Sequence, residues 1–198
     1  MFGSTFTPTA ASHGCGCSAA LQVEASVKVS VPELDTMPEA QANELLSDCC
    51  GASRWVSGMV ARRPFGSRVA VLSAADEIWR SLDAADWREA FSHHPRIGER
   101  KSAVPQSDRG ISWAAGEQSR VERANEDVRT ALAAVNREYE HRFGYTYIVF
   151  ATGKSAEEML ALARERLRND PDVELRANAE EQRKITRLRL EKLLDKGR

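Results

Sequence analysis

The chain has 198 residues, 42% of them hydrophobic, and its 28 basic and 29 acidic residues leave a net charge of −1. This length and composition suit a single globular domain with its own core, and the even charge balance argues against nucleic acid or an anionic membrane as a partner. No apolar run approaches the roughly 20 residues needed to span a bilayer.

The first thirty residues are rich in Ser, Thr, Ala and Gly. They lack the basic start and apolar core of a secretory signal, and the chain does not end in a peroxisomal Ser-Lys-Leu. We therefore expect a disordered tail over residues 1–30, a folded domain over 31–195 and a cytoplasmic protein. The cysteines at 15 and 17 and at 49 and 50 lack C-x-x-C spacing, which favours a reducing compartment without disulfides.

The first two helices are predicted from signals at their ends. Thr36 and Glu39 have the spacing of a capping box, with Pro38 in the first turn. Gly51 is suited to the left-handed end of that helix. A second helix follows and ends at Pro64.

The next two helices lead to a turn. Ser73 is predicted to open a third helix and Asp83 to cap a fourth. The fourth helix ends at His94, because Pro95 disfavours the α conformation in the residue before it. Residues 96–112 contain Gly, Pro, Ser and several charges without an apolar period, so we expect a loop long enough to be functional.

The second half of the chain is predicted to be largely helical. Apolar residues recur at steps of three and four up to Phe143, which indicates one long amphipathic helix that Gly144 ends. Asn136, inside this helix, is assigned a structural role. Ser155 opens a further helix, and the last helix covers most of 173–194.

The run Tyr145–Phe150 is the exception, since its β-branched and aromatic residues are typical of a buried strand. A lone strand has no partner for its backbone groups. Two interpretations remain open: the run pairs with its copy in a second subunit, or it lies extended with free N–H and C=O groups facing another molecule or segment.

His94 is the strongest candidate for chemistry. It stands before Pro95 in a turn that ends in Gly98, and its imidazole exchanges protons near neutral pH. The alternative is a turn histidine bonded to nearby backbone. His93 falls in the last helical turn, where a cation is favourable, and receives a structural role. The histidines and Glu99 show no zinc-ligand spacing.

Two further polar residues are candidates for the same site. Glu117 is either a solvated carboxylate in the first turn of a long helix or part of a site. Arg189 is one of several basic residues in the last helix. It lies four residues after Ile185 and next to Leu188, at the border of the apolar face that this helix is expected to bury. A guanidinium there requires a partner, because an unpaired buried charge is costly.

These features occur together in one known family. The chain contains, in order, Arg54-Trp55-Val56, Arg63-Pro64-Phe65, His94-Pro95-Arg96-Ile97-Gly98-Glu99, Trp113 to Ser119, Asn136-Arg137-Glu138-Tyr139, Arg142-Phe143-Gly144-Tyr145 and the helix with Arg189. In order and spacing they resemble the 2-oxo-4-hydroxy-4-carboxy-5-ureidoimidazoline (OHCU) decarboxylase family, over about residues 34–194.

The resemblance implies an all-α fold, a single helical domain of about seven to eight helices. It implies decarboxylation of OHCU to (S)-allantoin, the last step of urate degradation, by a homodimeric carboxy-lyase. The substrate is a small ureide, and no metal or organic cofactor is expected. The alternatives are a non-catalytic helical binding module, and a decarboxylase or lyase acting on a related ureide.

The resemblance also assigns site residues. His94 matches the catalytic histidine, Glu117 the glutamate that contacts substrate and histidine, and Arg189 the substrate-binding arginine. Ala114 stands where family members commonly carry serine, so one substrate hydrogen bond is missing at that position. Ser112 and Ser119 are alternative sources of that hydroxyl, although neither stands at the matching position. The expected substrate-binding residues are Pro95, Ala114, Gln118, Tyr147, Ile148, Val149, Phe150 and Ala151.

Overall fold

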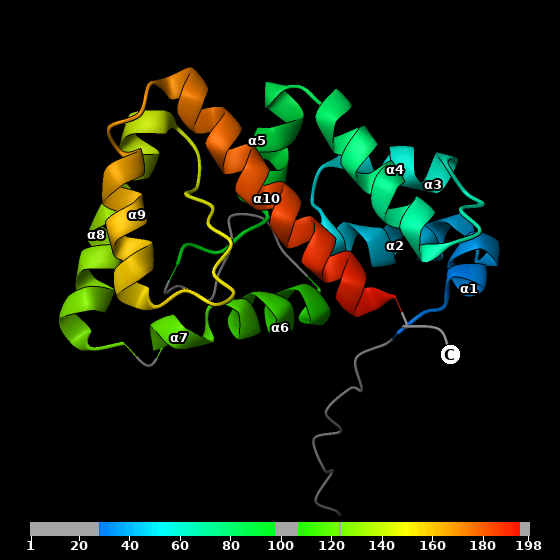
Figure 1. Ribbon diagram of the computed structural model, residues 1–198, viewed down its shortest axis with the longest axis horizontal. Coiled ribbons are helices and arrows are strands. Elements are labelled where there is room, and N and C mark those ends of the chain that lie inside the picture. Colours follow the sequence, from blue (N-terminus) through cyan, green and yellow to red (C-terminus); the bar gives the residue numbers. More distant parts are fainter. Residues whose placement is uncertain (1–27, 98–106, 123, 195–198) are drawn as a thin grey trace, which may run out of the picture.

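The computed structural model describes residues 28–97, 107–122 and 124–194. These residues form helices and no β-sheet (Figure 1), which confirms the all-α class. Eight of the described helices have nine residues or more, in agreement with the expected seven to eight. Most of the expected tail lies outside the described residues. The helices are α1 (Val31–Thr36), α2 (Glu39–Cys49), α3 (Ser53–Ala61), α4 (Arg68–Ser81), α5 (Ala84–Ser92), α6 (Asp108–Glu117), α7 (Ser119–Glu122), α8 (Glu126–Phe143), α9 (Ala156–Arg166) and α10 (Pro171–Leu193).

The first capping box lies earlier than the sequence predicted. Ser30 and Glu33 form it, at the start of α1. The predicted box of Thr36 and Glu39 is wrong, because Thr36 is the last residue of α1 and its hydroxyl donates to the backbone of that helix. Helix α2 therefore starts without a side-chain cap.

Three other helix starts depend on polar caps. Helix α4 begins after Ser67 rather than at Ser73, because the Ser67 hydroxyl accepts a hydrogen bond from the backbone N–H of Ala70. Asp83 caps α5 and Ser155 caps α9, each in a capping box, as predicted. Ser73 lies inside the continuous helix α4, where no helix start is left for it to cap.

The long helix predicted up to Phe143 is interrupted. Helix α6 ends at Glu117, α7 is a single short turn, and α8 starts after Asn125, whose side chain accepts a hydrogen bond from the N–H of Val128. The apolar period runs through this break and hides it, whereas the polar cap at Asn125 marks it. Gly144 ends α8 in the left-handed conformation, with φ of 78°, as predicted.

Helix α6 begins at Asp108, inside the stretch 96–112 that was expected to be a loop. The Ser107 hydroxyl caps it by accepting from the N–H of Gly110, and it also donates to the Asp48 carboxylate of α2. Residues 98–106 of the expected loop lie outside the described residues. The contact between Ser107 and Asp48 anchors the helix that ends at the candidate site.

Helix α10 lies at the centre of the domain. In Figure 1 it crosses the molecule between a group formed by α2 to α5 and a pair formed by α8 and α9, and it packs against α2, α4 and α5. The Trp79 indole N–H donates to the backbone oxygen of Ala179 at 3.1 Å and so ties α4 to α10. This packing fixes the side chains that α10 contributes to the site. None of the described helices is long and apolar enough to cross a membrane.

Candidate active site

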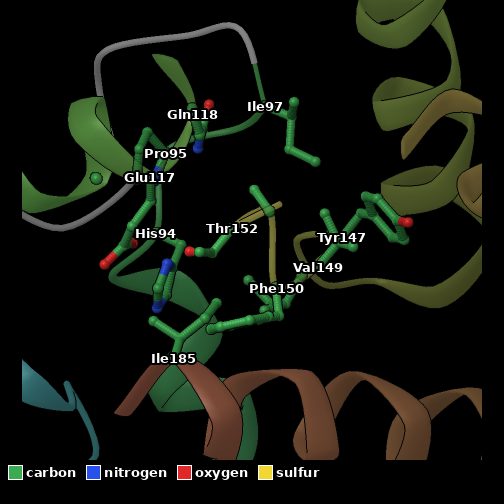
Figure 2. Close-up of a pocket in the computed structure, with 13 residues that line it drawn as sticks. His94, Pro95, Ile97, Glu117, Gln118, Tyr147, Val149, Phe150, Thr152 and Ile185 are labelled. Atoms are coloured by element: carbon green, nitrogen blue, oxygen red, sulfur yellow. The ribbon is translucent and has the colours of Figure 1, made fainter. Parts of the chain in front are cut away.

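A pocket lies where three segments meet: the turn after α5, the end of α6 and the extended run after α8 (Figure 2). About 430 Å³ of space is not filled by protein atoms there, including the part of the pocket that is open to solvent. All eight residues expected to bind substrate line it, together with His94 and Glu117. Ile97, Thr152 and Ile185 also line the pocket, although they were not among the expected site residues.

His94 reaches the pocket from the turn after α5. Its backbone N–H donates to the carbonyl oxygen of Phe91 at 3.1 Å, and the residue is only 8% exposed. Burial, reinforced by the nearby Arg189 and His93, holds the pKa of His94 well below its ordinary value of 6.5. The imidazole is therefore neutral at pH 7 and is able to accept a proton.

His93 has a different environment. It is half-buried and packs against the backbone of Gly51, where an added Cβ would lie 2.3 Å from the imidazole Cγ. Gly51 is required for this close approach. The prediction that Gly51 ends α2 in a left-handed conformation is wrong, since Cys50 caps that helix in an extended conformation. This packing supports a structural role for His93.

Glu117 and Arg189 form a buried ion pair beside the pocket. Arg189 Nε and Nη2 donate to the carboxylate at 3.2 and 3.0 Å, and the side chains are only 9% and 3% exposed. Glu117 is the last residue of α6, not part of a first helical turn as expected, so its charge meets the negative end of the helix dipole. The positive charges of Arg189 and Lys192 offset this unfavourable contact with the dipole, and Lys192 Nζ lies 3.5 Å from Glu117 Oε1.

The three expected catalytic residues converge in the fold. His94 and Glu117 line the pocket, while His94 and Arg189 both line a second cavity that shares His94 with it. Arg189 Nη1 also donates to the backbone oxygen of Asp48 at 3.3 Å. Arg189 is not part of the pocket wall. It influences the pocket by holding the Glu117 carboxylate and by lowering the pKa of His94.

The run Tyr145–Phe150 is extended, and side chains satisfy part of its backbone. The N–H of Ile148 donates to Asn178 Oδ1 at 2.8 Å, and Arg166 Nη1 donates to the Ile148 oxygen at 2.8 Å. The N–H of Phe150 donates to Glu181 Oε2 at 2.7 Å. These bonds come from α9 and α10, so two helices hold this wall of the pocket in place.

Val149 differs from its neighbours in that wall. Among the described residues, neither its N–H nor its C=O has a hydrogen-bond partner, and the residue lines the pocket. This agrees with the interpretation of an extended segment with free backbone groups. Such groups can bind the N–H and C=O groups of a small polar ligand.

Glu174 anchors the network behind the same wall. It is fully buried and accepts hydrogen bonds from Arg166 Nε at 2.8 Å, from Asn169 Nδ2 at 2.7 Å and from the Tyr139 hydroxyl. Arg166 Nη2 also donates to Asn178 Oδ1 at 2.9 Å. Nothing in the sequence marked this cluster, because acidic residues in the first turn of a helix are common for dipole reasons alone.

The chemistry available at the pocket follows from these groups. It offers a neutral imidazole, a carboxylate held by two cations and unpaired backbone groups. In the described part of the chain, no group of three or more His, Cys, Asp or Glu side chains is placed to hold a metal ion. The arrangement is suited to binding a small polar molecule and to exchanging a proton with it.

Known sequences similar to this chain are named for uric acid degradation or for OHCU decarboxylation. A sequence model of the family described as OHCU decarboxylase matches residues 35–191. The chain is 36% identical over 145 residues to the uric acid degradation bifunctional protein TTL of Arabidopsis thaliana, covering 73% of this chain and 45% of that protein. It is 29% identical over 135 residues to the 2-oxo-4-hydroxy-4-carboxy-5-ureidoimidazoline decarboxylase of Amia calva, covering 67% and 75%. It thus spans less than half of the Arabidopsis protein.

The fold agrees with the sequence match. A crystal structure of OHCU decarboxylase in the presence of (S)-allantoin superposes with a TM-score of 0.65 and 34% sequence identity, covering 76% of this chain and 96% of that one. The family match extends over most of the chain and includes all three residues His94, Glu117 and Arg189. The chain therefore belongs to the OHCU decarboxylase family.

Proposed function

We propose that the chain catalyses the decarboxylation of OHCU to (S)-allantoin in urate degradation, as a cofactor-independent carboxy-lyase. The observation that carries the proposal is a buried His94 that lines a pocket beside the ion pair of Glu117 and Arg189, and burial holds its pKa well below the ordinary value. The relatives support the substrate. The Amia calva protein is named as the decarboxylase of this compound, and the similar crystal structure was determined in the presence of (S)-allantoin.

The substrate brings much of the chemistry itself. When the bond to the carboxylate breaks, carbon dioxide leaves and an electron pair stays on the ring carbon. Unsaturation next to that carbon takes up the pair, so the substrate is its own electron sink and needs no organic cofactor. The protein has to position the ring and to deliver a proton to one face of the carbon.

The site residues then have distinct roles. His94 exchanges a proton with the substrate hydroxyl or with the new carbanion. Glu117 orients His94 and binds a substrate N–H or hydroxyl. An arginine bonded to the departing carboxylate would stabilise the ground state of the substrate and so slow the loss of carbon dioxide. Arg189 is bonded to Glu117 instead. Gln118 and the free backbone groups of Val149 bind the ureide.

The proposal is tested with freshly prepared OHCU and purified protein. We expect OHCU to disappear faster than by spontaneous decay, with one carbon dioxide released per molecule. A rate equal to spontaneous decay contradicts the proposal. If such a protein still bound (S)-allantoin, it would be the non-catalytic binding module, whereas activity only on another ureide would make it a related lyase.

Ala114→Ser is expected to lower the KM for OHCU several-fold at most, with a smaller effect on kcat. Ala114 lines the pocket and is 4% exposed, so a hydroxyl there can reach the ligand. One added hydrogen bond contributes about 0.5–1.5 kcal/mol net. Steady-state kinetics decide the matter, and an unchanged or raised KM would show that the added hydroxyl does not bind substrate.

Metal removal is expected to leave the activity unchanged. The substrate supplies the electron sink, and we assign every proton transfer to His94. The measurement is kcat/KM before and after dialysis against EDTA. Activity that is lost on dialysis and returns with zinc or manganese would overturn this part of the proposal.

We also propose that the protein is a cytoplasmic homodimer. The run Tyr145–Phe150 does not carry this proposal, because most of its apolar side chains are buried within the chain itself; the family resemblance does. Light scattering at micromolar concentration is expected to give twice the 21.9 kDa mass of one chain. A mass equal to that of one chain contradicts the dimer.

A further inference from the structure

The polar side chains around the pocket are mostly committed to other residues. The Glu117 carboxylate is bonded to Arg189, and Gln118 already interacts with other residues. The Tyr147 hydroxyl is buried without a hydrogen-bond partner in the described structure, but in Figure 2 it points away from His94 and Glu117. Glu117 and Gln118 therefore contact a ligand only with the donor and acceptor positions that these interactions leave over.

Thr152 is different. It is exposed and lines the pocket, and its hydroxyl oxygen points toward His94 in Figure 2. No hydrogen bond of this hydroxyl to another described residue is present. A hydroxyl offers one donor and two acceptor positions, which suits a ureide that presents both N–H and C=O groups.

The pocket lacks the hydroxyl that was expected at position 114. Ala114, which lines the pocket, offers only a methyl group where the family resemblance led us to expect a serine hydroxyl. Among the residues that line the pocket, Thr152 is thus the one whose free hydroxyl faces His94.

We propose that Thr152 is a substrate-binding residue whose hydroxyl hydrogen-bonds the ureide next to His94, in place of the hydroxyl absent at Ala114. This inference rests on the proposed function for its ligand. The groups it binds are the amide-type N–H and C=O groups that OHCU shares with (S)-allantoin. Thr152 binds substrate and transition state alike, so its loss raises KM more than it lowers kcat.

The test compares three variants by calorimetry with (S)-allantoin. Thr152→Val removes the hydroxyl and keeps the shape, and we expect the Kd to rise about 2- to 10-fold, as the loss of one hydrogen bond predicts. Thr152→Ser keeps the hydroxyl and retains wild-type affinity. Thr146→Val, the same change in the extended run that precedes Thr152 but outside the pocket lining, leaves the Kd unchanged.

A second readout separates this inference from the proposed function. The KM for OHCU is expected to rise by the same factor as the Kd in Thr152→Val. If the wild-type protein binds (S)-allantoin but does not decarboxylate OHCU, the proposed function fails while the Kd series still supports Thr152. An equal Kd for wild type and Thr152→Val, an equal effect of Thr146→Val, or no binding by the wild type overturns the inference.

Discussion

His94→Asn is expected to lower kcat for OHCU decarboxylation by about 10²- to 10⁴-fold, the usual contribution of a placed acid–base group. Asparagine keeps a polar side chain of similar reach but cannot exchange the proton. The free energy of unfolding should change little, because the turn is held by backbone contacts such as the bond from His94 N–H to Phe91 O. Steady-state kinetics and urea unfolding on the same preparation measure both quantities.

His93→Ala is the matched control, because the neighbouring imidazole packs on Gly51 outside the pocket lining. It should keep most of the activity. Comparable losses of kcat in the two variants would mean that the assignment of proton transfer to His94 is wrong. Full activity in His94→Asn would remove the imidazole from the mechanism altogether.

Glu174→Ala is expected to have the largest effect on stability, lowering the free energy of unfolding by about 3–5 kcal/mol, the usual cost of breaking a buried ion pair. The change leaves Arg166, whose side chain is only 12% exposed, without its carboxylate. Asn169 and the Tyr139 hydroxyl lose the same acceptor. The urea midpoint reports the loss, and the pocket wall at Ile148, bonded to Arg166, should loosen with it.

Glu77→Ala is the control for that experiment. Glu77 pairs with Arg62 at 2.7 Å, but both side chains are more than half exposed, and such a pair contributes less than about 1 kcal/mol. Similar midpoints for Glu174→Ala and Glu77→Ala would show that the buried network does not stabilise the domain.

The helical class was predictable because apolar residues repeat at helical steps along most of the chain. The residues at which the helices begin and end were harder to predict. A period of three and four residues continues from α7 into α8, so the break at Asn125 is visible only as a polar cap. Thr36 and Glu39 have capping-box spacing, but Thr36 is the last residue of α1, which Ser30 and Glu33 cap, and α2 starts without a side-chain cap.

The site was predictable where the resemblance carried residues over. His94, Glu117 and the backbone from Tyr147 to Ala151 surround one pocket as expected. Arg189 was recognised because it lies at the edge of the buried apolar face of the last helix. Its partner Glu117 lies 72 positions away, and no spacing rule connects the two residues. Thr152 could not be found, since an exposed threonine after an apolar run gives no signal by itself.

The most direct test of the account is the handedness of the product. Freshly prepared OHCU is mixed with wild-type protein and with His94→Asn, and circular dichroism follows the allantoin that forms. With wild-type protein we expect rapid formation of (S)-allantoin alone, because the pocket delivers the proton to one face, and with His94→Asn the slow racemic product of spontaneous decay. Racemic allantoin at the spontaneous rate with the wild-type protein would contradict the central claim.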